Sequence, residues 1–339
     1  MTGQILTHQL LSSTGVHSRR RSARAALGAT ASRLLPPWLR ARSPLQPLAR
    51  WWFRNHLTVL GYHQIDAPDT FAKHLDHLVA RATPVSLDEA IDALLARAEL
   101  PPHAVLVTFD DGHPSLLDTG LPLLRQRGVP AVAFVVAGSI DTHRPHWWTE
   151  VRHLVAAGGV SGRLGQAADT EAVELLKRVT DEERQATIRE LRASAREPAP
   201  PARQLRHDEL RELEAGGVEV ASHSLTHPCL DRCTNDVIHC EVRRAHELLT
   251  GVLGHEPRAF AYPNGDHDAR VRRAVAACGY QVAFAFDGRL SPLPAPDRLA
   301  VSRVHVESGT SLDRFRVIVS GLQAALFQLR SRVAHNAGA

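Results

Sequence analysis

The stretch AVLVTFDDGH, residues 104–113, raises the question on which the fold assignment depends. Its first six residues are almost all apolar or β-branched and predict a buried β-strand over 104–109. The strand runs directly into Asp110 and Asp111, and Gly112 supplies a turn. Two adjacent carboxylates at the end of a buried strand are unusual, because charged groups avoid burial unless something compensates them. The neighbouring strands show what that compensation is.

The body of the chain alternates short apolar runs with amphipathic helical stretches. Strands separated by helices of this length predict βα units and a parallel sheet. About seven such units favour a distorted (β/α)7-type barrel over an open doubly wound sheet, and neither a dinucleotide fingerprint nor a P-loop follows any strand. Besides 104–109, strands are expected at 57–65, 129–138, 218–222, 258–262, 280–286 and 298–306.

Residues 1–56 form an Arg-rich N-terminal tail. They contain nine arginines and no Asp or Glu, which leaves 31 basic against 36 acidic residues in the rest of the chain. The pI of about 9.2 therefore comes from the tail, and we expect no nucleic-acid partner. No convincing signal peptide and no membrane span are visible, so a cytoplasmic location is expected. Leu, Trp and Arg mix over 32–53, which indicates either a disordered tail or a peripheral anchor at the inner face of the membrane.

The remaining segments complete the predicted organisation. Residues 57–310 form the catalytic domain, with a polar helical insertion and a proline linker over 161–204. Residues 311–339 form a C-terminal amphipathic helix, expected over 311–333, and a tail. The capping box of Ser86 and Glu89 predicts that a helix begins there. The four cysteines lack a CxxC pair and are interpreted as free thiols rather than zinc ligands.

Polar residues follow several of the predicted strands. His223 and His227 stand four apart after strand 218–222, and YPNG ends strand 258–262. The first strand ends in Tyr62-His63, and the last carries Arg303 and His305. The carboxyl ends of parallel barrel strands meet at one rim, so these groups are expected to converge on Asp110 and Asp111. One carboxylate and two imidazoles can hold a catalytic zinc-type ion with open positions, and the second carboxylate can then move a proton.

At this point the sequence resembles the polysaccharide deacetylases, carbohydrate esterase family 4, with the NodB homology fold. The matching motifs are TFDDG (108–112), SHSLTHP (222–228) and FAYPNG (260–265), within a resemblance that covers about 57–307. The resemblance implies that Asp110 is the general base, and that a divalent metal is bound by three side chains, which are Asp111, His223 and His227. It further implies a substrate-binding segment formed by Tyr262, Pro263 and Asn264, with a backbone N–H of this loop helping to hold the oxyanion.

The sequence departs from the family pattern at two positions. Many members have Arg where this chain has Ala261, and that Arg steadies the catalytic aspartate. Arg303, on the last strand, is our candidate substitute. Asn264 replaces the usual aromatic after the proline, which affects sugar stacking more than catalysis because that position acts through its backbone.

The general acid has two candidates. Family members generally use a His on a late strand, which is His305 here. The early LGYHQI stretch resembles a branch with circularly permuted motifs, in which the His of YH takes that role, and we prefer His63 on this basis. Trp147 and Trp148 either stack on a sugar or pack against the barrel wall.

The resemblance implies a metal-dependent hydrolase that removes N-acetyl groups from amino sugars of a polysaccharide or glycan precursor and releases acetate. We expect the protein to be a monomer. Zn²⁺ is the expected ion, with Co²⁺, Ni²⁺ and Mn²⁺ as alternatives. One alternative function is a deacetylase or deformylase of a lipid-linked or nucleotide-linked amino sugar. The other is an inactive carbohydrate-binding relic, which a missing base or metal ligand would indicate.

Overall fold

The computed structural model describes residues 45–327, which lie in a compact unit that begins at Pro44. The predictions for residues 1–44 and 328–339 lie outside the described residues. Within 45–327, eight strands form one sheet in which every named pair is parallel, in the order β7-β6-β5-β4-β3-β1-β8 with β2 beside β3. The strands are β1 Thr58–Tyr62, β2 Thr83–Pro84, β3 Ala104–Phe109, β4 Ala131–Val135, β5 Val218–Ser222, β6 Ala259–Ala261, β7 Val282–Phe284 and β8 Val304–His305.

The sheet curls because one segment contacts both of its edges. Val301 bridges Phe284 of β7, and three residues later Val304 pairs with Leu60 of β1. The chain before β8 therefore joins the two end strands. The predicted distorted (β/α) barrel is confirmed, with this short and irregular segment as its closing element.

Both faces of the strands are buried. Along β3, Leu106 belongs to a cluster inside the curl that also contains Val132 and Phe134 of β4. Val105 and Val107 point the other way and pack against the surrounding helices. Apolar side chains on both faces are typical of a parallel barrel strand, which explains why AVLVTF shows no polar alternation.

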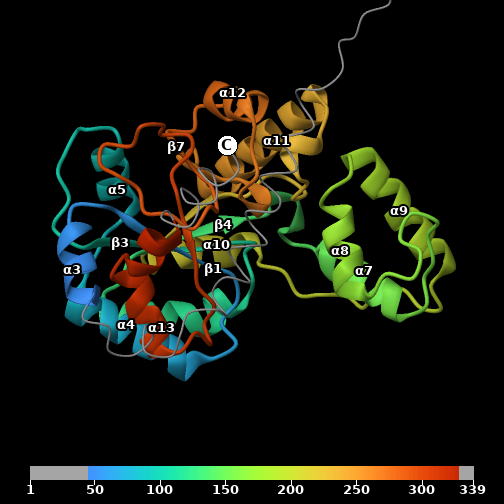
Figure 1. The fold of residues 1–339 in the computed structure, drawn as a ribbon. Coiled ribbons are helices and arrows are strands. Elements are labelled where there is room, and N and C mark those ends of the chain that lie inside the picture. The colour runs from blue at the N-terminus through green and yellow to red at the C-terminus, as the bar shows by residue number, and fades with distance from the viewer. Residues whose placement is uncertain (1–44, 328–339) are drawn as a thin grey trace, which may run out of the picture. The chain divides into compact units, whose positions relative to one another are not determined.

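Helices cover the sheet on its outer side, except α5, whose buried residues pack with the inward-facing cluster (Figure 1). Ser86 caps α5 through the predicted capping box with Glu89. The helices around the barrel are α4 Pro68–Arg81, α5 Leu87–Leu94, α6 Leu121–Arg127, α10 His207–Ala215, α11 Asn235–Leu253, α12 Ala269–Ala277 and α13 Leu312–Val319. The expected continuous helix over 311–333 is wrong, because α13 ends at Val319 and Gly321 takes a φ of 79° before helical residues resume at 322.

A group of three helices overlaps the insertion predicted over 161–204. It consists of α7 Trp147–Ala156, α8 Asp169–Leu176 and α9 Asp181–Ser194, which lie together at one side of the sheet (Figure 1). Apolar residues of the three helices form a core of their own. Helix α7, which precedes the predicted insertion of 161–204, supplies part of that core.

Residues 45–56, predicted as part of the tail, are folded. They contain helix α3, Leu45–Trp52, in which Ala49 is buried. Phe53 packs against the main core, and the carbonyl of Arg54 accepts a hydrogen bond from the N–H of His103. The helices of the described residues include none with the length and apolarity that crossing a membrane requires.

Candidate active site

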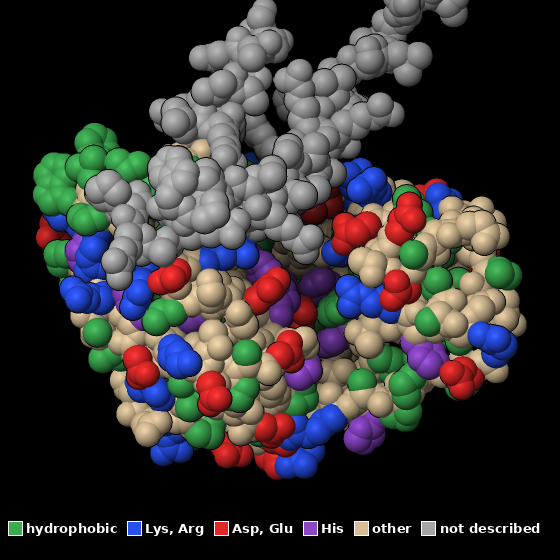
Figure 2. Space-filling model, turned by 60° about the horizontal axis from the view of Figure 1, so that its bottom comes forward, with side chains coloured by type: hydrophobic (Ala, Val, Ile, Leu, Met, Phe, Trp, Pro, Cys, Tyr) green, Lys and Arg blue, Asp and Glu red, His purple; other side chains and the backbone are tan. Residues whose placement is uncertain are grey.

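The carboxyl ends of the central strands bring the predicted polar residues together. Tyr62 pairs with Phe109, and Ser222 pairs with Phe260, so the residues that follow these positions emerge side by side. Figure 2 shows histidine side chains gathered in a hollow of this face. The site is therefore a product of strand register in a parallel sheet.

The Asp-Asp-Gly turn points Asp111 into this site. Asp111 and Gly112 have φ values of 70° and 71°, and a Cβ on Gly112 would lie 3.1 Å from the Val135 side chain. The left-handed backbone favours glycine at this position, and the close approach of β4 adds to that preference. Oδ1 of Asp111 is buried and has no hydrogen-bond partner in the structure. An unpaired buried carboxylate oxygen indicates a ligand to be bound.

The two histidines are presented by a tightly held loop. Nδ1 of His223 donates to the carbonyl of Ala261 at 2.8 Å, which leaves Nε2 unprotonated and directed at Asp111. The Glu241 carboxylate accepts from the N–H groups of Leu225 and Thr226 and from the Thr226 hydroxyl. Three donors on one buried carboxylate fix the loop between the two histidines, so both imidazoles face the same point.

The three side chains fit a divalent cation. Nε2 of His223 and Nε2 of His227 lie 3.6 and 3.5 Å from Oδ1 of Asp111. Ligands held about 2.0–2.1 Å from a tetrahedral ion lie about 3.3–3.4 Å from one another, so the observed spacing matches. They are the single group of three or more potential ligands found among residues 45–327.

The electrostatics of the three ligands also favour a cation. Burial, and then Asp110, raise the pKa of Asp111 to about 8. Burial lowers the pKa of His223 and holds that of His227 well below its ordinary value, so both imidazoles are neutral and offer a lone pair to a cation. A bound cation would supply the positive charge that stabilises the ionised form of the buried Asp111 carboxylate.

Asp110, the other carboxylate of the turn, is ion-paired. The Arg303 guanidinium donates to its two oxygens at 2.6 and 2.8 Å, and both residues are buried. Burial raises the pKa of Asp110, but Arg303 and His223 outweigh it and bring the pKa to about 2. The contact predicted for Arg303 as the substitute for an arginine at Ala261 is present. Its role in catalysis stays a prediction.

Aromatic rings hold the Arg303 guanidinium in place. It lies 4.6 Å from the Phe286 ring and 5.2 Å from the Phe134 ring, and it also donates to the Thr108 hydroxyl. A Cβ on Gly61 would lie 2.6 Å from the Phe286 ring, so this glycine leaves room for it. The pair of Asp110 and Arg303 therefore has little freedom to move.

Both candidate acids lie beside Asp110. Gly61 pairs with His305 across β1 and β8, and the rings of His63 and His305 are 5.5 Å apart. Burial lowers the pKa of His63 to about 4, which Asp110 opposes and His305 reinforces. Burial also lowers the pKa of His305, although its side chain is exposed. The structure brings together all the residues to which we assigned catalysis or metal binding.

The Tyr262-Pro263-Asn264 segment follows β6 at the same rim. Asn264 has a φ of 56° and its side-chain amide donates to Sγ of Cys229 at 3.3 Å. Tyr262 is fully buried, and its hydroxyl donates to the carbonyl of Leu299. We therefore correct the assignment of the Tyr262 side chain, which anchors the loop from within the core. Contact of Pro263 and Asn264 with substrate stays a prediction.

The insertion contacts the metal-type cluster. Nε1 of Trp147 donates to the His227 carbonyl at 2.9 Å, and buried Arg184 donates to the same carbonyl at 3.4 Å. The Arg184 guanidinium also lies 4.6 Å from the Trp147 ring. Trp147 is thus a packing residue, whereas the partly exposed Trp148 stacks on His146 and lies 4.5 Å from the His227 ring. His227 has a φ of 59°, and these contacts hold that backbone in place.

Sequence reasoning missed the residues that support the site. Glu241 sits mid-helix in α11 and Arg184 sits in a charge-rich helix, and both positions look like solvent-exposed surface in the sequence. A burial pattern was the only available signal, because Glu241 occupies the same face of α11 as Ile238 and Ala245.

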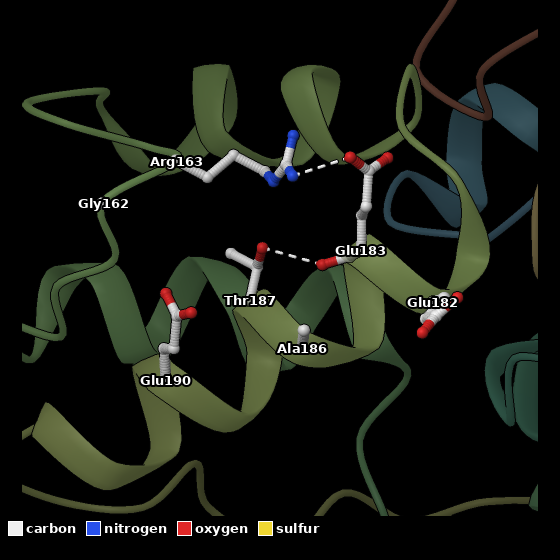
Figure 3. Close-up of a pocket in the computed structure, with 7 residues that line it drawn as sticks. All are labelled: Gly162, Arg163, Glu182, Glu183, Ala186, Thr187 and Glu190. Carbon is white, nitrogen blue, oxygen red and sulfur yellow. Dashed lines mark hydrogen bonds and ion pairs between the residues drawn. The ribbon is translucent and has the colours of Figure 1, made fainter.

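A separate surface hollow lies in the insertion. It is lined by Gly162, Arg163, Glu182, Glu183, Ala186, Thr187 and Glu190 (Figure 3). Arg163 and Glu183 form an ion pair at 2.7 Å across it, and Thr187 bonds to the Glu183 carbonyl. None of its residues belongs to the metal-type cluster, and its partly paired carboxylates offer no comparable chemistry.

A curled parallel α/β barrel that holds an Asp-His-His cluster beside a buried, ionised aspartate defines a hydrolase with a metal-type site. The polysaccharide deacetylase family model matches residues 97–283, which is more than half of the chain. The chain therefore belongs to the polysaccharide deacetylase family and is an amide-bond hydrolase of the deacetylase class.

Several solved structures share this fold. The deacetylase PplD of Streptococcus pyogenes, in complex with acetate, has a TM-score of 0.55 and 18% identity, covering 76% of this chain and 96% of its own. IcaB from Ammonifex degensii has a TM-score of 0.55 and 21% identity, covering 80% and 98%. A de-N-acetylase from Aggregatibacter actinomycetemcomitans has a TM-score of 0.56 and 18% identity, covering 78% and 99%.

Proposed function

We propose that this protein removes N-acetyl groups from amino sugars of a polysaccharide or glycan precursor in a reaction that depends on a divalent metal. The observation that carries the proposal is the pairing of two adjacent carboxylates with different tasks. Asp111 joins His223 and His227, whereas Asp110 is held ionised by Arg303. The family membership and the names of similar structures, which include a de-N-acetylase, support an acetamide as the target.

Each residue has a place in the proposed mechanism. Asp111, His223 and His227 would hold a divalent ion, for which we expect Zn²⁺. Such an ion would supply Lewis acidity, which polarises a carbonyl and lowers the pKa of water toward about 7. Asp110 accepts the proton of the water that attacks the acetamide carbonyl carbon. The backbone N–H of Asn264 donates to the oxyanion that develops. The C–N bond then breaks as the protonated imidazolium of His63, the form that the Asp110 charge favours, gives its proton to the leaving nitrogen and yields an amine.

The acid assignment yields a prediction. His63→Ala is expected to lower kcat by ~10²–10⁴-fold, and His305→Ala by less than ~10-fold. The His63 side chain is the more buried, and Asp110 is the charged group with the largest effect on its pKa, whereas Glu307 is that group for His305. The loss of kcat in His63→Ala should be smaller when 4-nitroacetanilide is the substrate, because its leaving group needs less protonation. Rates of both variants on an oligosaccharide and on the anilide check this. A larger loss in His305→Ala would transfer the acid role to His305.

The His227 carbonyl yields another prediction. Trp147→Phe keeps an aromatic ring at this position but removes the pyrrole part of the indole, with the N–H that bonds to this carbonyl. We expect the dissociation constant for Zn²⁺ to rise by ~10-fold, because residues that orient metal ligands contribute about that much. Calorimetric titration of the chelated protein measures the constant, with Trp148→Phe as the matched control. Equal affinities in all three proteins would show that the indole N–H has no positioning role.

The substrate is tested by its released acid. We expect the full chain to release acetate from short N-acetylglucosamine oligomers. Acetate or formate release only from lipid-linked or nucleotide-linked amino sugars would favour the alternative substrate class. The presence of Asp110, Asp111, His223 and His227 argues against an inactive relic. Such a relic would release neither acetate nor formate from any of these substrates. The cytoplasmic location and the monomeric state stay predictions.

A further inference from the structure

Helix α3 presents apolar side chains to solvent. Six large hydrophobic residues are exposed among residues 45–327, and four of them lie on this eight-residue helix: Leu45 at 45%, Leu48 at 59%, Trp51 at 58% and Trp52 at 67%. We call these four residues the α3 apolar face. Isolated exposed hydrophobics are ordinary, but a cluster of this kind marks an interaction surface.

The orientation of α3 is fixed by its other side. Leu45, Leu48 and Trp52 follow the three- and seven-residue spacing of one helical face. On the other side Ala49 is buried, and Phe53, just after the helix, packs into the main core. The Arg54 carbonyl, which accepts the His103 N–H at 2.7 Å, fixes the chain as it leaves α3. The α3 apolar face therefore cannot turn inward without breaking this anchoring, and α3 lies at the outer edge of the fold (Figure 1).

The groups around α3 are predominantly basic. The Arg54 guanidinium lies 4.8 Å from the Trp51 ring. Burial and the nearby Arg81 lower the pKa of Arg50. Burial lowers the pKa of His77 to about 4, and Arg316, Arg50 and Arg81 add to that effect. Arg316 pairs with Asp313 at 3.2 Å, so the positive field comes mainly from the other arginines.

We propose that the α3 apolar face, with Arg50, Arg54 and Arg81 around it, docks the protein on an anionic lipid bilayer. Leu and Trp insert at the boundary between headgroups and acyl chains, where amphipathic indole rings are favoured, and arginines attract anionic headgroups. A second copy of the chain is a poorer occupant, because a self-complementary contact would bring the two sets of arginines together. The deacetylase site does not depend on this docking.

Flotation of the full-length protein with vesicles tests the proposal. Vesicles of phosphatidylcholine with a third of phosphatidylglycerol should bind wild-type protein, and pure phosphatidylcholine vesicles should bind it at least ~10-fold less. The Trp51→Ser/Trp52→Ser variant should lose ~10-fold or more of the binding to the anionic vesicles. The matched control is Val160→Ser, which alters an equally exposed apolar residue far from α3 in the chain and should bind as wild type does.

Two results would overturn the proposal. Undiminished vesicle binding of the double Trp variant would mean that arginines alone, including those before residue 45, attract the lipid. The second result concerns self-association. If sedimentation equilibrium shows that wild type is a dimer and the double Trp variant a monomer, and if neither protein binds vesicles, the α3 apolar face is a contact between two copies of the chain. Leu48→Glu provides a second variant should the double substitution impair folding, and thermal unfolding of each variant monitors that.

Discussion

Asp110→Asn is expected to lower the rate of acetate release by at least ~10³-fold, because an amide cannot accept the proton of the attacking water. The side chain is nearly isosteric, so the Asp111, His223 and His227 cluster should still bind one divalent ion. Acetate quantification together with metal analysis of the purified variant checks both parts. Retained metal with lost activity identifies Asp110 as the base.

The control for this variant is its fold. The Asp110→Asn substitution leaves the buried Arg303 guanidinium with one acceptor oxygen where it had two, so some stability will be lost. The assay therefore belongs at a temperature at which circular dichroism shows the variant to be folded. Activity within ~10-fold of wild type in folded, metal-loaded Asp110→Asn would contradict the assignment of the base.

Arg303→Met is expected to have the largest effect on stability. It leaves a fully buried Asp110 carboxylate without its bidentate partner, which costs about 3–5 kcal/mol in the free energy of unfolding. In the double variant Asp110→Asn/Arg303→Met neither charge remains. Its loss of unfolding free energy should therefore be smaller, by ~1–3 kcal/mol, than the sum of the losses in the two single variants. Urea unfolding of the four proteins measures this coupling. Strict additivity would mean that the ion pair contributes little.

The same pair sets a pH dependence. The pKa of Asp110 is about 2 in the folded protein and about 3.9 when unfolded, so its contribution to stability is present above pH ~4 and is lost as the pH falls toward 2. In Arg303→Met, the rise of this pKa that burial causes is opposed only by His223 and His63, so the Asp110 pKa should increase. The stability difference between wild type and variant should therefore be largest near neutral pH and narrow on acidification. A difference independent of pH between 7 and 3 would rule out Asp110 as its cause.

Strand positions were predictable because each strand carries its own signal. AVLVTF is apolar throughout and its strand was predicted at its observed bounds, and the predicted strand 218–222 also matches. The segment that closes the barrel was harder to predict from the sequence. Only Val304 and His305 form a regular strand there, and Val301 pairs through an isolated bridge. The folded state of α3 depends on long-range contacts of Ala49 and Phe53, for which a local sequence window has no signal.

The site was predictable to the extent that topology brings strand ends together. Parallel strands place Asp111 and His223 at one rim, and the family resemblance identified Arg303 as a partner for Asp110. The supporting contacts could not be foreseen. Glu241 reaches back from α11 to Thr226, and Trp147 reaches from the insertion to His227, and in each case the partners are brought together only by the tertiary fold.

The central claim is that Asp111, His223 and His227 hold a metal on which deacetylation depends. The most direct measurement is acetate release from N-acetylglucosamine oligomers by the full-length protein, first after chelation and then during titration with Zn²⁺, beside His223→Ala. We predict no release from the chelated protein, full recovery at one ion per chain, and neither metal binding nor release in His223→Ala. Undiminished release from protein shown to be free of metal would contradict the account.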